Sequence, residues 1–192
     1  MDKIDKKKIG RYEIIRELGY GGMAVVYLVR DSQLDRVAAL KLIRKRHFSP
    51  EQSDMMMERF RREAKALAKL NHPNIVNIYD YGEHEGAPYL VMEYLDGITL
   101  KDIQKPISVS AAIGLIRPIA KALDYVHQNG LLHRDVKSSN IMLTRDKRIV
   151  LTDFGIAKST ENEGGWPDLT ETGVGIRSEE HTSELQSLVI IS

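Results

Sequence analysis

Three chemically distinct side chains lie close together in the run His133–Asn140, which reads His-Arg-Asp-Val-Lys-Ser-Ser-Asn. It offers an acid (Asp135), a cation (Lys137) and an amide (Asn140), and a second acid, Asp153, follows 18 residues after Asp135. Carboxylate and amide oxygens are hard ligands that suit Mg²⁺ beside phosphate groups. A solvated loop can contain any one of these residues, but the set as a whole indicates phosphate and metal chemistry.

A glycine-rich segment at residues 19–26, Gly-Tyr-Gly-Gly-Met-Ala-Val-Val, is a second candidate for binding phosphate. Glycine permits a tight turn and lets main-chain N–H groups approach phosphate oxygens closely. A plain β-turn is the alternative interpretation. A P-loop is excluded because no Lys-Ser/Thr pair follows, and a dinucleotide-binding fingerprint is excluded because the next residues are typical of a strand rather than a helix.

Lys41 lies in the apolar run 37–43, on the same predicted strand face as Val37 and Ala39. An ammonium on an apolar face needs a partner, unless it extends to solvent from the strand edge. Glu63 lies three residues after Phe60 and four before Leu67, so it shares the apolar stripe of a predicted helix. We therefore expect Lys41 and Glu63 to face each other.

The elements that must position these residues change character along the chain. The helix over about 50–70 begins with Ser49 and Pro50, and a second helix is predicted over 110–128. Its predicted inward face consists of Ile113, Ile116, Ala120 and Leu123. Strands are predicted at 11–18, 24–30, 36–44, 75–81 and 88–94. The order predicts an α+β fold with a cleft near residues 95–97.

Composition limits the classes of function. The 192 residues carry 28 Lys and Arg against 27 Asp and Glu, a net charge of +1, which argues against nucleic acid as a partner. Because the chain has no cysteine, thiol catalysis, disulfides and iron–sulfur sites are excluded. No apolar run is long enough to span a membrane, and the charged N-terminus is unlike a secretory signal, so we expect a cytoplasmic segment.

Together the motifs resemble, in order and spacing, those of Ser/Thr protein kinases, especially the bacterial kinases of the eukaryotic type, over about residues 11–176. The resemblance implies a bilobal protein-kinase-like fold. After a tail at 1–10, it implies a complete β-rich small lobe at 11–94 and an incomplete helical large lobe at 95–176. Lys137, two residues after Asp135, has the Ser/Thr-kinase form rather than the usual tyrosine-kinase form.

The resemblance also implies a role for each matching residue, with ATP and Mg²⁺ as cofactors. Asp135 matches the catalytic base, Lys137 the residue that contacts the γ-phosphate, and Asn140 and Asp153 the Mg²⁺ ligands. Lys41 matches the lysine that holds the α- and β-phosphates, with Glu63 as its helix partner. The implied nucleotide-binding residues are Leu18, Gly19, Gly21, Ala24, Val26, Ala39, Lys41, Met92, Glu93, Leu95 and Met142. Ala24 stands where the family usually has a third glycine.

Thr170 and Thr172 lie where similar bacterial kinases phosphorylate themselves, so we expect them to be regulatory phosphosites. A phosphate brings a charge of about −2 that can pair with Arg134, the residue before the implied base. A polar loop rich in Ser and Thr is the alternative interpretation.

The resemblance ends after Ile176. Residues 177–187, Arg-Ser-Glu-Glu-His-Thr-Ser-Glu-Leu-Gln-Ser, match the translation of a common short-read sequencing adapter. We therefore expect residues 177–192 to be a non-native tail and the kinase domain to be truncated at its C-terminus. A genuine polar tail is the alternative.

These observations predict an enzyme that transfers the γ-phosphoryl group of ATP to Ser and Thr hydroxyls of protein substrates. The alternative is a truncated, inactive fragment that binds nucleotide. A kinase-domain dimer is expected for autophosphorylation. In the full-length parent, a membrane anchor is expected to come from the missing C-terminal region.

Overall fold

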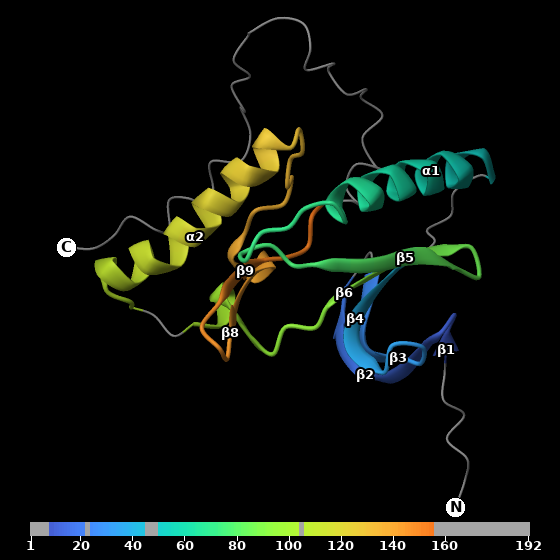
Figure 1. Ribbon diagram of the computed structural model, residues 1–192, viewed down its shortest axis with the longest axis horizontal. Coiled ribbons are helices and arrows are strands. Elements are labelled where there is room, and N and C mark those ends of the chain that lie inside the picture. Colours follow the sequence, from blue (N-terminus) through green and yellow to red (C-terminus); the bar gives the residue numbers. More distant parts are fainter. Residues whose placement is uncertain (1–7, 22–23, 45–49, 104–105, 156–192) are drawn as a thin grey trace, which may run out of the picture. The chain divides into compact units, whose positions relative to one another are not determined.

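The computed structural model describes residues 8–21, 24–44, 50–103 and 106–155 (Figure 1). The predicted phosphosites Thr170 and Thr172 lie outside the described residues, and so does the predicted non-native tail at 177–192.

A six-stranded antiparallel sheet forms the N-terminal half of the described chain. Its strands are β1 (Lys8–Ile9), β2 (Tyr12–Tyr20), β3 (Ala24–Asp31), β4 (Arg36–Ile43), β5 (Ile78–His84) and β6 (Ala87–Glu93). They are arranged in the order β1-β2-β3-β4-β6-β5. The buried positions of β3, β4 and β6 are mostly apolar, and they include Val25, Val29, Leu40, Leu90 and Val91. Residues 8 and 9, assigned to a tail from the sequence, pair with β2 and bury Ile9.

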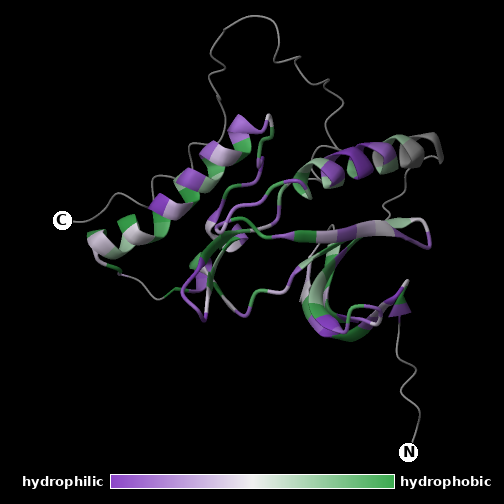
Figure 2. Ribbon diagram, in the orientation of Figure 1, coloured by the Kyte–Doolittle hydropathy of each residue, from purple (hydrophilic) through white to green (hydrophobic). Residues whose placement is uncertain are grey.

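Helix α1 (Pro50–Leu67) contacts β5 and β6 of this sheet. Its buried residues Phe60, Ala64 and Leu67 recur at helical spacing. Figure 2 shows that hydrophilic residues make up much of the described part of this helix. The helix ends three residues earlier than the sequence predicts. Because Phe60 is only 2 % exposed, the helix is held to the sheet by an apolar contact.

A second, three-stranded sheet begins just after the junction at residues 95–97. It consists of β7 (Gly97–Thr99), β8 (Ile141–Thr144) and β9 (Ile149–Leu151), and a short 3-10 helix, η1 (Leu100–Asp102), follows β7. Gly97 pairs with Thr144, and a Cβ at Gly97 would overlap the main chain of Leu143. A glycine is therefore required where β7 meets β8.

Helix α2 (Val109–Gln128) begins after Ser108, whose side chain accepts a hydrogen bond from the Ala111 N–H. Its buried residues are Ile119, Ala122 and Val126. The predicted inward face was therefore wrong: Ile113 and Ile116 are 54 % and 60 % exposed, Ala120 is exposed and Leu123 is only partly buried.

The error has a physical cause, since α2 carries apolar residues on more than one stripe. Figure 2 shows hydrophobic and hydrophilic segments alternating along it. The stripe that becomes buried is the one that meets β9, because α2 and β9 are in contact and Leu151 is fully buried there.

The predicted α+β class and bilobal arrangement are confirmed. One apolar cluster joins the first sheet and α1 to α2, β9 and Phe154, a second lies within the first sheet, and a third lies between α2 and the second sheet. None of the helices in the described ranges is both long and apolar enough for a membrane crossing.

Candidate active site

Asp135 and Asn140 are joined by hydrogen bonds in the loop between α2 and β8. The Asn140 side-chain amide donates to the main-chain oxygen of Asp135 at 2.9 Å and to its carboxylate Oδ2 at 3.0 Å. The Lys137 ammonium lies 3.1 Å from the same Oδ2. Asn140 is buried at the end of the 3-10 turn η2 (Ser138–Asn140), so it fixes the direction of the carboxylate. The structure thus brings together three residues that the sequence singled out.

His133 holds this loop through hydrogen bonds of its buried imidazole ring. It is 2 % exposed, and its Nδ1 accepts a hydrogen bond from the Asp135 N–H at 3.3 Å. Because Nδ1 accepts, the proton lies on Nε2, which donates to the Thr152 main-chain oxygen at 2.9 Å. Burial lowers the pKa of His133 below its usual value. A neutral, fully bonded imidazole positions the loop and is not available as a base.

Thr152 is a functional residue that sequence reasoning did not identify. Its main-chain N–H and hydroxyl both donate to the Asn140 main-chain oxygen, at 2.8 and 3.1 Å. Together with its contact to His133, this links the segment that carries Asp153 to the loop that carries Asp135. A buried threonine next to an acid is common, so no signal in the sequence pointed to this role.

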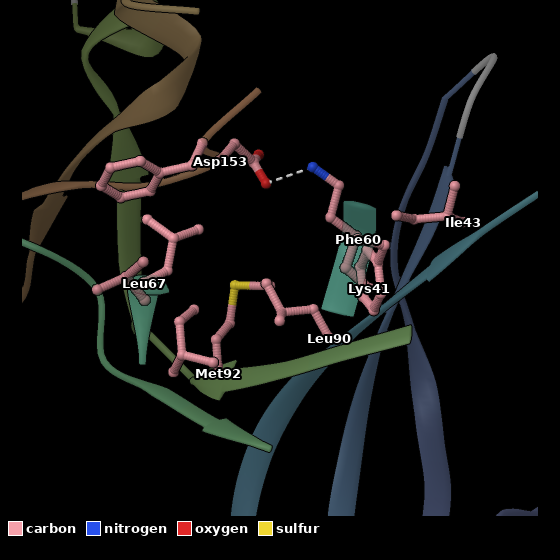
Figure 3. Close-up of a pocket in the computed structure, with 10 residues that line it drawn as sticks. Lys41, Ile43, Phe60, Leu67, Leu90, Met92 and Asp153 are labelled. Carbon is pink, nitrogen blue, oxygen red and sulfur yellow. Dashed lines mark hydrogen bonds and ion pairs between the residues drawn. The ribbon is translucent and has the colours of Figure 1, made fainter. Parts of the chain in front are cut away.

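Asp153 follows β9 with a left-handed main-chain conformation (φ 56°), which is uncommon for a residue with a side chain. Its carboxylate accepts a 2.7 Å bond from the Lys41 ammonium, across 112 positions of sequence. Figure 3 shows the two side chains extending toward each other from β4 and from the segment after β9. The side chains are 22 % and 36 % exposed, so water still reaches the pair.

Glu63 does not complete the predicted pair with Lys41. The ion pair recorded for Glu63 is with Arg134, at 3.3 Å, while Lys41 pairs with Asp153. The sequence placed Lys41 on a strand and Glu63 on a helix whose residues Phe60 and Leu67 line the same cavity as Lys41. It could not determine the choice of partner, because two acids compete for Lys41 and two cations for Glu63. Arg134 also has a left-handed main chain (φ 63°).

A cavity opens beside the Lys41–Asp153 pair. Figure 3 shows Met92, Leu90, Leu67, Phe60 and Ile43 around it. Val76, Ile78 and Phe154 complete the lining with the ion pair itself. The Phe154 ring packs on His133 with centroids 4.5 Å apart. The cavity is therefore apolar except for the two charged groups at its mouth.

Most of the apolar residues predicted to bind nucleotide belong to one cluster. Ala39, Met92 and Leu95 are buried in it. Leu18, Val26 and Met142 pack against it while remaining partly exposed. Ala39 is paired with Met92 across β4 and β6, and Val26 with Lys41 across β3 and β4. The sheet register thus places residues from β2, β3, β4, β6 and β8 around one site.

The glycine-rich segment joins β2 to β3, as the sequence predicts. Gly19 and Gly21 are exposed, and the Gly21 N–H donates to the Ala24 main-chain oxygen at 2.9 Å. Ala24 is paired with Ile43 and partly buried. Exposed glycines in the segment that joins two strands are compatible with a close approach of phosphate oxygens.

The oxygen atoms offered by Asn140 and Asp153 fit magnesium. The Asn140 Nδ2 is used for Asp135, which turns its Oδ1 to the other side, where the Ser139 hydroxyl lies at 3.4 Å. In the described part of the chain, no three His, Cys, Asp or Glu side chains cluster closely enough to hold a metal alone. Magnesium is usually held by one or two carboxylates together with substrate phosphates and water, so a sparse donor set of this kind suits it.

Comparisons with known proteins agree with this geometry. The family model described as the protein kinase domain matches residues 12–177. The chain is 44 % identical over 157 residues to the serine/threonine-protein kinase PrkC of Bacillus subtilis, an alignment that covers 80 % of this chain and 24 % of PrkC. It is 41 % identical over 189 residues to PknB of Mycobacterium tuberculosis, with 92 % and 29 % covered.

A solved structure is also similar. The kinase domain of Mycobacterium tuberculosis PknI superimposes with a TM-score of 0.67 at 37 % identity, covering 79 % of this chain and 62 % of that one. The chain belongs to the protein kinase domain family, and its curated relatives include bacterial Ser/Thr kinases. It spans roughly a quarter of the length of the curated relatives it matches.

Proposed function

We propose that this chain binds MgATP and transfers the γ-phosphoryl group to serine and threonine hydroxyls of proteins. The observation that carries the proposal is the convergence of Asp135, Lys137 and Asn140 on one loop, opposite the Lys41–Asp153 pair. Membership of the kinase family and its Ser/Thr kinase relatives support the same activity.

In this proposal the apolar cluster holds the adenine. Ala39, Val26 and Met142 contact the ring, while the main chain at Glu93 and Leu95 recognises its polar edge. The exposed glycines 19 and 21 cover the phosphates, and Lys41 contacts the α- and β-phosphates. Asp153 and Asn140 hold the metal, which when bound offsets negative charge on the phosphates.

The chemical step is an in-line displacement. The substrate hydroxyl oxygen forms a bond to the γ-phosphorus while the bond to the β,γ-bridging oxygen breaks, and ADP leaves with that electron pair. The Asp135 carboxylate, aimed by Asn140, orients the hydroxyl and takes its proton. Lys137, beside the same carboxylate, contacts the transferred group. Positioning and charge stabilisation supply most of the rate.

The test uses the 192-residue chain with MgATP labelled at the γ-phosphorus and dephosphorylated casein as acceptor. We expect label on Ser and Thr of casein from the parent chain and at least a hundred-fold less from Asp135→Asn, which keeps the shape of the side chain and loses the base. Equal labelling by both chains would contradict the assignment of Asp135. Nucleotide binding without any transfer would instead favour an inactive nucleotide-binding fragment.

Arg134 and the two threonines extend the proposal to regulation. Phosphorylation of Thr170 or Thr172 would supply an anion for Arg134, which pairs with Glu63 in this structure. Phosphopeptide mapping of the active chain tests this point, and finding neither threonine modified would contradict it.

A further inference from the structure

Glu93, the last residue of β6, has every polar group of its side chain engaged. Its carboxylate is 15 % exposed. The Asn77 side-chain amide donates to Oε2 at 2.9 Å, and the Arg148 guanidinium donates to Oε1 at 2.5 Å. The Glu93 N–H donates to the Asn77 main-chain oxygen at 2.9 Å. Both the main chain and the side chain of Glu93 are therefore held by hydrogen bonds where β6 leaves the six-stranded sheet.

Arg148 is itself held firmly, because it lies in the tight β8–β9 turn. Its N–H donates to the Thr144 hydroxyl at 2.9 Å, and its main-chain oxygen accepts from the Thr144 N–H at 2.9 Å. Its Nε donates to Asp146 at 3.1 Å, and the hydrogen bond to Glu93 raises the pKa of its guanidinium. The planar group thus presents a fixed pair of donors rather than a mobile charge.

Asn77 belongs to the connection between α1 and β5, which is bound to the same β-hairpin. The Asn74 side-chain amide donates to the Ile149 oxygen at 2.7 Å. The Leu151 N–H donates to the Asn74 oxygen at 2.8 Å, and the Val76 N–H donates to the Leu151 oxygen at 3.0 Å. The two partners of Glu93 are therefore parts of one hydrogen-bonded body built on β8 and β9.

We propose that Asn77 and Arg148 are positioning residues, which fix Glu93 so that its main chain is held ready for the adenine of the nucleotide. This inference rests on the proposed nucleotide site and adds to it two residues that do not touch the ligand. A main chain that is already held in its binding conformation loses less conformational entropy when the ligand binds, so the ligand binds more tightly.

The neighbouring pair Arg145–Asp96 provides a natural control. It also joins the β8–β9 turn to the segment after β6, with Nε and Oδ2 3.2 Å apart. Its side chains are 82 % and 53 % exposed, whereas those of Arg148 and Glu93 are 37 % and 15 % exposed. An exposed pair contributes little to positioning, while a partly buried charge-assisted bond contributes more.

The experiment measures by calorimetry the binding of two separate probes, adenosine and magnesium inorganic triphosphate. We expect Arg148→Met to weaken adenosine binding about three- to ten-fold while triphosphate binding changes less than two-fold. Arg148→Lys should restore part of the loss, because it keeps the charge without the planar fork. Arg145→Met should bind both probes as the parent chain does.

Glu93→Gln, which keeps the shape of the side chain, is the second variant should Arg148→Met fail to fold. It should weaken adenosine binding about two- to five-fold. Where Arg148→Met does fold, the double variant should bind adenosine about as weakly as Arg148→Met alone, because the two changes remove one interaction. Unchanged adenosine binding in Arg148→Met or Glu93→Gln would overturn the inference. An equal loss for both probes would also overturn it, since that indicates general loosening. A parent chain that binds neither probe would overturn the proposed nucleotide site itself.

Discussion

Replacing Asn140 by Asp separates two roles of this residue. As a metal ligand, a carboxylate would serve at least as well as an amide. The variant carboxylate cannot act as the donor that orients Asp135. It would stand where the Asn140 Nδ2 now lies, 3.0 Å from Asp135 Oδ2 and 2.9 Å from the Asp135 main-chain oxygen. The hydrogen-bond geometry therefore predicts a less stable chain.

The magnitude follows from Coulomb's law. Two unit charges 3 Å apart repel by ~5–6 kcal/mol at an effective dielectric constant of 20, and by ~3 kcal/mol if the side chains move to 6 Å. Such movement is available because the Asp135 side chain keeps 18 % exposure. The two lost hydrogen bonds add about 1 kcal/mol each. We expect Asn140→Asp to lower the free energy of unfolding by about 4–6 kcal/mol near pH 8.

The penalty should depend on pH. Repulsion raises the pKa of the carboxyl pair in the folded variant above the usual value of about 4, so the folded state takes up a proton more readily than the unfolded state. The variant's deficit is therefore small near pH 4 and grows as pH rises through the raised pKa. Urea unfolding at about pH 5 and pH 8 measures it, with Asn140→Ser as control for the lost donor alone. A deficit equal to that of Asn140→Ser at both pH values would refute the argument.

The other predictions concern the supports of the site. Burial lowers the pKa of His133 in the folded state. Its contribution to stability is therefore fully present above about pH 6.5 and is lost as pH falls through the lower folded pKa. Urea unfolding between about pH 7 and pH 5 should show a weaker pH dependence in His133→Gln than in the parent chain, and an identical slope would contradict this. Val126→Lys, at a fully buried position of α2, should lower the free energy of unfolding by several kcal/mol. Ile116→Lys, at a position 60 % exposed, should change it by less than about 1 kcal/mol in the same assay. Similar losses for both variants would show that the stripe containing Ile116 is covered.

The sequence predicts the small lobe well because its strands are long and largely apolar, and β3 in particular is rich in valine. It does not predict β8 and β9, which have four and three residues, since runs this short carry no readable period. The buried face of α2 was missed for a related reason. That face is determined by contact with β9, which lies far along the chain and was not predicted.

The candidate site, too, could be predicted from the sequence only in part. Residue type and spacing singled out Lys41, Asp135, Asn140 and Asp153; in the structure Lys41 pairs with Asp153, and Asn140 bonds to Asp135. The partners of Lys41 and Glu63 could not be predicted, because they depend on how elements more than seventy residues apart in sequence pack against each other. The engagement of Glu93 by Asn77 and Arg148 is likewise a product of folding alone.

The α1–β5 connection is hydrogen-bonded to β9, so the C-terminal end of α1 is the end of the helix that is fixed to the second sheet. With 18 residues at 1.5 Å each, the helix is about 27 Å long, and Glu63 lies only about 6 Å from the last residue, Leu67. A swing of 10° would carry the far end of the helix about 5 Å but would move Glu63 by only about 1 Å. Glu63 therefore lies near the end of α1 that the second sheet fixes, where a tilt of the helix moves it least and disturbs its ion pair with Arg134 least.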